Sequence, residues 1–344
     1  MTIKNTNFTK AEILDTTQSL TVFKAVKDAS TIVLTTHEGP DGDGLGSELG
    51  LARALRRLGK KVTIVNPGET LKRFKYMDKH DDLNVLNGKH TDILMSADLA
   101  LLIDTAEIGR TGAVGDVLAK RTGPVLAVDH HAPNDRTIDG ILGSNFPSTG
   151  ELMFHVINRL GVDITADIAE PLYSAMLYDT AQFRYVRNDP EVFQVASLLV
   201  QAGADAEGIA RHLFGTISKD SMLMQSRLMS TAKFELGGRL AWSPVTSNTL
   251  AGLKLDRDEI RSMVDVLGNI DGVEICVLFK DYDGPKVKIS MRSRGKATVN
   301  DVAEQLGGGG HPKAAGADVL MPLDEAIAKT LPLLRAKLSP SDPK

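Results

Sequence analysis

Three short apolar segments of this 344-residue chain each end in aspartate or histidine. They are TIVLTT before His37, LALLI before Asp104 and VLAV before Asp129. Apolar runs of this length are typical of buried strands, and residues with helical periodicity follow the first two. Alternating strands and helices predict a parallel sheet whose strands end at one common edge. We therefore expect the polar side chains after these strands to meet at that edge.

The stretch HEGPDGDGLGS, which begins at His37, places one imidazole and the carboxylates of Asp41 and Asp43 within seven residues. Leucine and alanine then recur at helical spacing up to Gly59. Carboxylates this close repel one another unless a cation lies between them, so a divalent cation is the simplest explanation. The alternative is an Asp-Gly turn with Asp43 near a helix N-cap and His37 as an incidental loop residue.

Composition restricts the class of protein. The chain has 42% hydrophobic and 24% charged residues, which is typical of a globular protein, and its length predicts two domains. A net charge of −4 and 5% aromatic residues argue against a broad nucleic-acid-binding surface. We expect a cytoplasmic protein with no membrane partner, because no apolar run is long enough to cross a bilayer or to act as a secretion signal. The single cysteine, Cys276, is expected in a core strand.

Periodicity predicts the following elements. The expected strands of the first domain are 31–36, 61–65, 99–105 and 125–128, with a β-like segment at 182–186. Its expected helices are 11–27, 45–58, 107–118, 148–161 and 166–177, followed by helical spacing across 191–229. The second domain is expected to contain strands 240–245, 273–279 and 287–292 and helices 256–267, 299–306 and 323–338. The predicted fold is α/β: a parallel-sheet N-terminal domain (1–190), a helical connector (191–230) and a smaller α/β C-terminal domain (231–340).

The candidate ligands of the first domain are carboxylates and imidazoles, with no thiolate among them. They are His37, Asp41, Asp43, Asp104, Asp129, His130, His131 and Asp179. Oxygen and imidazole ligands favour hard or borderline cations such as Mn²⁺. Their number exceeds what one cation normally binds, so a bridged pair of cations is the better match.

The segment LGGGGHPKAAGA is the most glycine-dense part of the chain. We expect a loop at Gly308–Gly310, where the backbone can approach a ligand closely. His311, Lys313, Arg292 and Arg294 would bring hydrogen-bond donors to that ligand. The alternative for the two arginines is an exposed strand end.

HEGPDGDGLGS, the Asp104 loop, VDHH and YDT at 178–180 resemble the four motifs of the DHH phosphoesterase superfamily, and GGGGHPKAAG resembles its DHH-associated C-terminal domain. The resemblance covers nearly the whole chain. It departs from the family pattern at Gly44, where alanine is common, and after the glycine run, where KAAGA stands in place of a sequence with serine. Length and motif order are most similar to bacterial oligoribonucleases that also act on 3′-phosphoadenosine 5′-phosphate (pAp).

The resemblance implies two divalent cations, with Mn²⁺ expected. The first would be held by His37, Asp41 and Asp104, and the second by Asp43, Asp104, His130 and Asp179. It also implies that Asp104 bridges, that His131 faces the scissile phosphate and that Asp129 lies behind the loop. Substrate contact is assigned to Arg292, Arg294, Gly308, Gly309, Gly310 and His311, with Lys313 and Arg110 as further candidates.

The expected activity is metal-assisted hydrolysis of phosphoesters by water. The expected substrates are very short RNA, cleaved to 5′-mononucleotides, and pAp, converted to AMP. Alternatives are hydrolysis of linear dinucleotides made from cyclic dinucleotide signals, and hydrolysis of pyrophosphate or polyphosphate. A nucleotide-binding regulator without activity is a further alternative, against which the intact set of ligand types argues. Apolar edges of the first domain are compatible with a homodimer.

Overall fold

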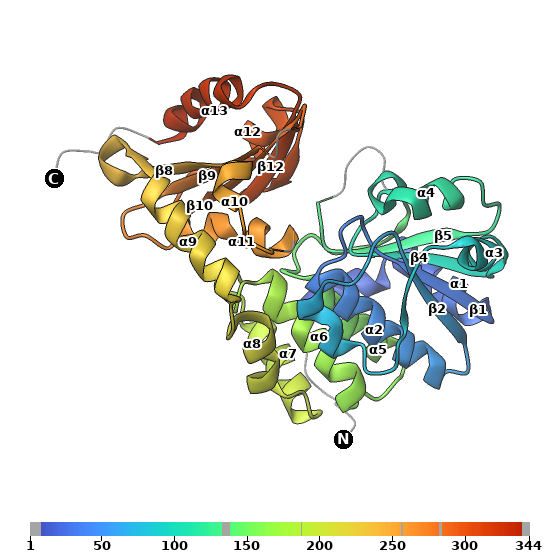
Figure 1. Ribbon diagram of the computed structural model, residues 1–344. Coiled ribbons are helices and arrows are strands. Elements are labelled where there is room, and N and C mark those ends of the chain that lie inside the picture. Colours follow the sequence, from blue (N-terminus) through green and yellow to red (C-terminus); the bar gives the residue numbers. More distant parts are fainter. Residues whose placement is uncertain (1–7, 133–137, 187, 256, 282–283, 339–344) are drawn as a thin grey trace. The chain divides into compact units, whose positions relative to one another are not determined.

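The computed structural model describes the chain except residues 1–7, 133–137, 187, 256, 282–283 and 339–344 (Figure 1). The chain forms two compact units, Met1–Thr216 and Ile217–Lys344, each built on its own six-stranded sheet. The boundary between the units lies within the predicted connector. The first residue of the predicted helix 256–267 and the last two of the predicted second domain lie outside the described residues.

The first unit alternates strands and helices. Its strands are β1 (Thr31–Thr35), β2 (Lys61–Asn66), β3 (Leu83–Val85), β4 (Leu99–Ile103), β5 (Val125–Asp129) and β6 (Gly140–Leu142). Its helices are η1 (Lys10–Asp15), α1 (Thr17–Asp28), α2 (Gly42–Arg57), η2 (Lys72–Met77), α3 (Gly88–Ser96), η3 (Ile108–Thr111), α4 (Gly112–Leu118), α5 (Thr149–Arg159), α6 (Ala166–Asp179), α7 (Pro190–Gln201) and α8 (Ala206–Phe214).

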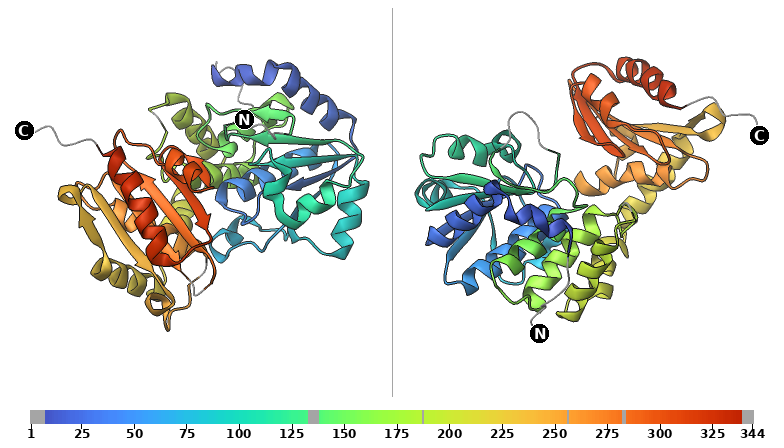
Figure 2. Two further views of the ribbon diagram at one scale, coloured as in Figure 1. Left: turned by 90° about the horizontal axis from the view of Figure 1, so that it is seen from above. Right: turned by 180° about the vertical axis from the view of Figure 1, so that it is seen from behind.

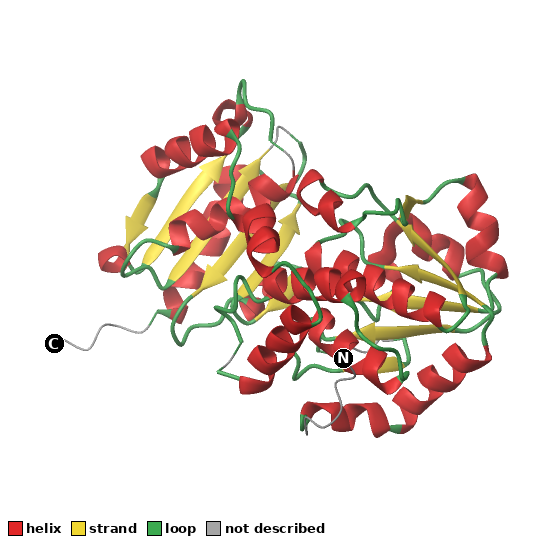
Figure 3. Ribbon diagram, turned by 90° about the horizontal axis from the view of Figure 1, so that it is seen from below, coloured by secondary structure: helices red, strands yellow, loops and turns green. Residues whose placement is uncertain are grey.

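All strands of the first sheet run parallel, in the order β3-β2-β1-β4-β5-β6. Alternate residues of a strand point to opposite faces, and β1 follows this rule. Ile32 and Leu34 join the core formed with α2, α5 and α6, whereas Val33 joins the core formed with α3 and α4. Helices therefore cover both faces of the sheet (Figure 3), which confirms the predicted fold class.

Helices α2 and α6 pack closely because small residues of α2 face α6. A Cβ added at Gly46 would lie 2.3 Å from the carbonyl oxygen of Pro171, and one at Gly50 would lie 2.6 Å from Leu172 Cδ2. At the start of α2, a Cβ at Gly42 would lie 2.7 Å from Tyr178 Cγ, near the end of α6. Glycine permits this backbone approach, which brings the amino end of α2 beside the carboxyl end of α6.

The second unit contains a mixed sheet. Its strands are β7 (Lys233–Glu235), β8 (Leu240–Val245), β9 (Ile275–Asp281), β10 (Val287–Ser293), β11 (Gly309–His311) and β12 (Ala314–Val319). Its helices are α9 (Lys219–Thr231), η4 (Leu236–Gly238), α10 (Ser247–Leu250), α11 (Arg257–Gly268), α12 (Asn300–Gln305) and α13 (Leu323–Lys337).

The strand order of the second sheet is β11-β12-β10-β9-β8-β7, with β8 and β9 parallel and the other pairs antiparallel. Trp242 and Phe279 pack with α12 and α13 on one face, and α13 is the dark red helix along the sheet in Figure 2. Cys276 and Leu278 pack with α9 and α11 on the other face. The prediction of a core position for Cys276 is confirmed. Among the described helices, none combines the length and apolar character needed to span a membrane.

The β-like prediction for 182–186 is wrong, because this segment forms turns after α6. The N–H of Gln182 donates to the carbonyl of Leu177 at 2.9 Å, and the N–H of Phe183 donates to Thr180 Oγ1 at 3.0 Å. Ala181, Gln182 and Phe183 all have positive φ, which no strand allows. Hydrogen bonds to the preceding helix end therefore override the strand propensity of the aromatic side chains.

Other boundaries also differ from the prediction. The single helix expected at 11–27 is divided into η1 and α1, because the side chain of Thr16 caps α1 by accepting from the N–H of Ser19. The sequence pattern did not indicate β3, α3, β6 or the glycine-rich hairpin β11–β12. The expected loop at Gly308–Gly310 is partly wrong, since Gly309 and Gly310 belong to β11. Glycine is depleted in strands, so four in a row predict a loop.

Candidate metal centre

Ligand candidates from three strands lie at one edge of the first sheet. His37 follows β1 by two residues, Asp104 follows β4 directly, and Asp129 ends β5 with His130 next to it. All four side chains are buried. They meet because neighbouring parallel strands end at the same edge, as the sequence predicts.

Three further carboxylates reach this edge from helix ends. Asp41 is the N-cap of α2, and its Oδ1 accepts from the N–H groups of Asp43 and Gly44 at 3.1 and 3.4 Å. Asp43 lies in the first turn of α2, and Asp179 is the last residue of α6. The close packing of α2 on α6 thus brings together carboxylates that are 136 positions apart in the sequence, from 43 to 179.

The first set of ligand atoms surrounds His37. Its Nε2 lies 3.8 Å from Asp41 Oδ1 and 3.5 Å from Asp104 Oδ2. Ligand atoms of these three residues all lie within 4.8 Å of one another. Two atoms that each lie about 2 Å from one cation are themselves roughly 3–4 Å apart, so this set fits a divalent cation.

The second set surrounds His130. Its Nε2 lies 3.7 Å from Asp43 Oδ2, 3.6 Å from Asp104 Oδ1 and 3.5 Å from Asp179 Oδ2. The atoms of Asp43, Asp104 and His130 again lie within 4.8 Å of one another. Asp104 takes part in both sets, with one carboxylate oxygen toward each, which suits a bridging ligand between two cations.

The carboxylates of this edge oppose one another's ionisation. Burial, together with the charges of Asp104, Asp179 and Asp41, raises the pKa of Asp43 well above its ordinary value. Burial is also the main cause that raises the pKa of Asp179 to about 6. Such mutual repulsion is relieved when divalent cations lie among the oxygens. The donor chemistry and the electrostatics therefore both fit metal binding.

The pKa of His37 is shifted by the same accumulation of negative charge. Burial disfavours the charged form of His37, but hydrogen bonds with Asp104 and Asp41 outweigh it and raise the pKa of His37 to about 10. An imidazole that holds its proton this tightly lies in a strongly anionic environment, and a cation would compete with that proton.

Asp104 has an unusual backbone conformation. Its φ is 63°, in the left-handed region that non-glycine residues rarely adopt. A residue in this region costs roughly 1 kcal/mol or more. The conformation is held on one side by the N–H of Asp104, which donates to the carbonyl of Val128 at 2.9 Å, and on the other by a side-chain bond from Thr149.

The amino end of α5 contacts two ligand carboxylates. The N–H groups of Thr149 and Gly150 donate to Asp43 Oδ2 and Oδ1 at 2.7 and 2.9 Å, and Thr149 Oγ1 donates to Asp104 Oδ1 at 2.7 Å. The sequence pattern predicts a helix at 148–161 but indicates no role at the metal centre for Thr149 and Gly150. The N-cap is Ser148, whose side chain accepts from Glu151 N–H, so the hydroxyl of Thr149 is available for Asp104.

A second hydrogen-bond network, which the sequence pattern did not predict, supports the turn after β1. The buried side chain of Asn66 accepts from the N–H of Thr36 at 3.1 Å and donates to Glu48 Oε2 at 2.8 Å. Burial raises the pKa of Glu48 to about 8. In the sequence, this contact is indicated only by Glu48, an acidic residue among the apolar residues of α2. Its position there does not identify Asn66 as the partner.

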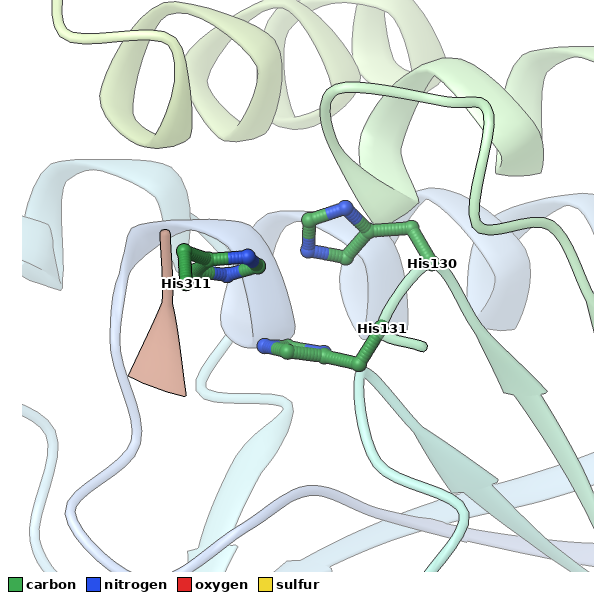
Figure 4. A group of neighbouring side chains, drawn as sticks. All are labelled: His130, His131 and His311. Carbon is green, nitrogen blue, oxygen red and sulfur yellow. The ribbon is translucent and has the colours of Figure 1, made fainter. Parts of the chain in front are cut away.

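His131 and Asp129 form a pair beside the two ligand sets. His131 Nδ1 lies 2.7 Å from Asp129 Oδ1 and 3.7 Å from Asp104 Oδ1. The rings of His130 and His131, shown in Figure 4, lie with centroids 4.4 Å apart and are tilted by 58°. Burial disfavours the charged imidazolium, but the bond to Asp129 and the charge of Asp104 raise the pKa of His131 to about 9.

Arg110 lies on the exposed side of this edge, in η3. Its carbonyl accepts from the N–H of Glu38 at 2.6 Å, which ties η3 to the loop after His37. The positive charge of Arg110 acts to lower the pKa of His131. The position is compatible with the predicted phosphate contact.

The predicted substrate residues of the second unit gather at one end of its sheet. The strand register places Arg292, Ala314 and His311 side by side. Arg292 Nε donates to Asp265 Oδ1 at 3.2 Å, and Lys313 Nζ donates to the carbonyls of residues 295 and 297, both at 2.6 Å. These donors therefore already have protein partners.

Arg294 and the predicted substrate-binding glycines belong to the same end of the second sheet. Arg294 Nη2 donates to Asn269 Oδ1 at 2.5 Å. Gly309 and His311 are exposed on the edge strand β11. Gly308 is required by packing, because a Cβ there would lie 2.1 Å from the carbonyl oxygen of Gly316.

Two family models match the chain. The DHH family, N-terminal domain, matches residues 31–176, which include His37, Asp104 and His130. The DHHA1 domain matches residues 243–337, which include the glycine-rich hairpin.

Relatives match over nearly the full length. The bifunctional oligoribonuclease and PAP phosphatase NrnA of Thermus thermophilus is 33% identical over 324 residues, covering 92% of this chain and 93% of the relative. The protein of the same name from Bacillus subtilis is 25% identical, covering 84% and 89%. A crystal structure of an exopolyphosphatase-related protein from Bacteroides fragilis has a TM-score of 0.85 at 27% identity, covering 93% and 96%. The chain therefore belongs to the DHH phosphoesterase family, with the DHH domain in its first unit and the DHHA1 domain in its second.

Proposed function

We propose that this chain hydrolyses very short RNA to 5′-mononucleotides and converts pAp to AMP. The observation that carries the proposal is the position of Asp104 between two sets of ligands that each fit a divalent cation. The names of the Thermus thermophilus and Bacillus subtilis relatives support this choice of substrates.

Two cations are proposed, one at each ligand set, with Mn²⁺ the best match. The ligands of the first are His37, Asp41 and Asp104, and those of the second are Asp43, Asp104, His130 and Asp179. Carboxylate and imidazole ligands without thiolate favour this borderline cation over a structural zinc site. When bound, a pair of divalent cations polarises phosphoryl oxygens and makes water acidic enough to attack phosphorus near neutral pH.

The residues beside the ligands would act on the phosphate. Asp129 holds His131 through Nδ1, so Nε2 of that imidazole would meet a phosphoryl oxygen and stabilise the charge that develops there. Arg110, exposed on the same edge, would bind a second phosphoryl oxygen. The residues proposed to bind the remainder of the substrate are in the second unit: Arg292, Arg294, Gly308, Gly309, Gly310, His311 and Lys313.

A second candidate function is hydrolysis of polyphosphate or pyrophosphate. The name of the Bacteroides fragilis structure favours it, since that protein is called exopolyphosphatase-related. Linear dinucleotides from cyclic dinucleotide signals are a further candidate. The exposed glycine-rich edge strand with His311 favours substrates that carry a nucleoside, because aromatic and imidazole rings stack on bases.

A substrate panel tests the proposal. The purified chain is incubated with Mn²⁺ and, separately, a dinucleotide, a five-nucleotide RNA, pAp, a linear diguanylate, polyphosphate and pyrophosphate, and initial rates are compared. We expect kcat/KM to be highest for the short RNAs, with turnover of pAp. Hydrolysis confined to pyrophosphate or polyphosphate would contradict the proposal. Parallel reactions with Mg²⁺ and Zn²⁺ test the choice of cation.

A further inference from the structure

Three donors at the amino end of α5 are directed to one of the two ligand sets. Thr149 and Gly150 N–H donate to the two oxygens of Asp43, which belongs to the His130 set. Thr149 Oγ1 donates to Asp104 Oδ1. That oxygen lies 3.6 Å from His130 Nε2, whereas Asp104 Oδ2 lies toward His37 at 3.5 Å. Thr149 therefore holds the carboxylate of Asp104 through Oδ1, which is the oxygen that lies toward His130.

The hydroxyl bond restrains a side chain whose backbone is already strained. Asp104 has φ of 63°, so its carboxylate direction depends on contacts that hold this conformation. Thr149 is fully buried, so no water replaces its hydroxyl when that group is removed. Both oxygens of Asp43, in contrast, are bonded by backbone N–H groups that no side-chain substitution removes.

The start of α5 also opposes the repulsion between the two carboxylates. The first N–H groups of a helix carry partial positive charge, which stabilises nearby anions. Asp43 and Asp104 are both acceptors at this helix start, so they are kept close despite their like charges. Two carboxylates fixed at this spacing need less rearrangement to bind one cation.

We propose that Thr149 is a positioning residue that selectively strengthens cation binding by Asp43, Asp104 and His130. This inference rests on the proposed function, because it requires the two cation sites. Without the hydroxyl, the carboxylate of Asp104 rotates away from its His130 side, and the affinity of this site falls. The site of His37 and Asp41 keeps its affinity, since Asp104 Oδ2 lies 3.5 Å from His37 Nε2 and does not accept from Thr149.

Calorimetric titration of the metal-depleted chain with Mn²⁺ tests the proposal. Thr149→Val removes the hydroxyl and keeps the backbone N–H and the side-chain size. We expect one of two binding steps to weaken by roughly 10–100-fold, as for other residues that orient metal ligands, and the other step to be unchanged. Thr149→Ser keeps the hydroxyl and should bind both cations like the wild type.

Thr31→Val is the matched control. Thr31 Oγ1 also donates to an aspartate, Asp98 Oδ2 at 2.9 Å, but at the amino end of β1, the opposite end of the strand from the ligands. It should bind both cations like the wild type even if its melting temperature falls.

Four outcomes would overturn the inference. The first is Thr149→Val with both steps unchanged, and the second is equal weakening of both steps. The third is Thr149→Ser with a weakened binding step although it keeps the hydroxyl, a result that can be read even if the valine variant does not fold. A wild-type chain that binds fewer than two Mn²⁺ would instead overturn the proposed function, and this inference with it.

Discussion

The two units hold their charged side chains in opposite ways. In the first unit, the carboxylates of Asp43 and Asp104 are buried, and backbone N–H groups and a hydroxyl hold them beside one another despite their like charges. In the second unit, Arg292 and Lys313 are partly exposed at strand ends and pair with neighbouring oxygens. The first arrangement fits cations, which relieve the repulsion, whereas the substrate contacts proposed for the second would require Arg292 and Lys313 to exchange protein partners for a ligand. Affinity for metal and affinity for substrate should therefore respond to different mutations.

Asp104→Ala should give the largest effect. It removes the one carboxylate shared by both ligand sets, so we expect activity on short RNA to fall by more than about 100-fold and both Mn²⁺ binding steps to weaken. Initial rates and calorimetry measure the two effects. Arg292→Ala is the comparison from the second unit, and it should raise KM while leaving Mn²⁺ binding unchanged. Wild-type turnover by Asp104→Ala would contradict the bridging role.

Glu48→Gln tests the pH dependence of the buried network. Burial raises the pKa of Glu48 from its ordinary value of 4.5 to about 8 in the folded chain. The folded state therefore binds this proton more tightly than the unfolded state. The contribution of Glu48 to stability should therefore be most favourable below about pH 4.5 and be lost as pH rises toward 8, by about 1.4 kcal/mol for each unit between the two pKa values.

The glutamine variant keeps an acceptor for Asn66 and cannot ionise. We expect its urea midpoint, measured with a chelator present, to match the wild type at pH 4.5 and to exceed it at pH 8. Parallel pH profiles for the two proteins would contradict the elevated pKa.

Cation binding should stabilise the first unit alone. A ligand present at 100 times its Kd stabilises the folded state by about 2.7 kcal/mol. The only tryptophan, Trp242, is on β8 of the second unit, so its fluorescence reports the unfolding of that unit. We expect Mn²⁺ to raise the temperature of one of the transitions seen by far-ultraviolet circular dichroism, and to leave unchanged the transition that Trp242 fluorescence reports. A shift of equal size in both signals would contradict this separation.

Gly309→Ala should give the smallest effect. Gly309 is exposed, and a Cβ there would meet no atom within 4 Å, so the melting temperature should not change. If the edge strand lies against substrate, the added methyl should raise KM for short RNA by about tenfold, equivalent to about 1.4 kcal/mol, with kcat unchanged. Gly284→Ala, at another exposed glycine with open space, is the control. Equal KM values for both variants would exclude close approach at Gly309.

The sequence indicated the parallel sheet and the residues at its edge, because apolar strands that end in Asp or His are local patterns. Strand ends converge by topology alone, which is why His37, Asp104 and Asp129 were predictable as neighbours. The contacts of Thr149 and Asn66 were not predictable, because they depend on where the start of α5 and the end of β2 lie in space. The turn at 182–186 was missed because hydrogen bonds to α6 override local propensity.

The left-handed backbone of Asp104 has a cost in stability at the same position where we propose a bridging metal ligand. Glycine adopts this conformation at no steric cost, and an Asp104→Gly substitution would also remove a buried negative charge. In a selection for heat resistance with a chelator present, we expect glycine to be enriched at position 104, in chains that are more stable and lack the proposed activity. Mutant libraries made to raise the thermal stability of this protein should therefore keep Asp104 unchanged.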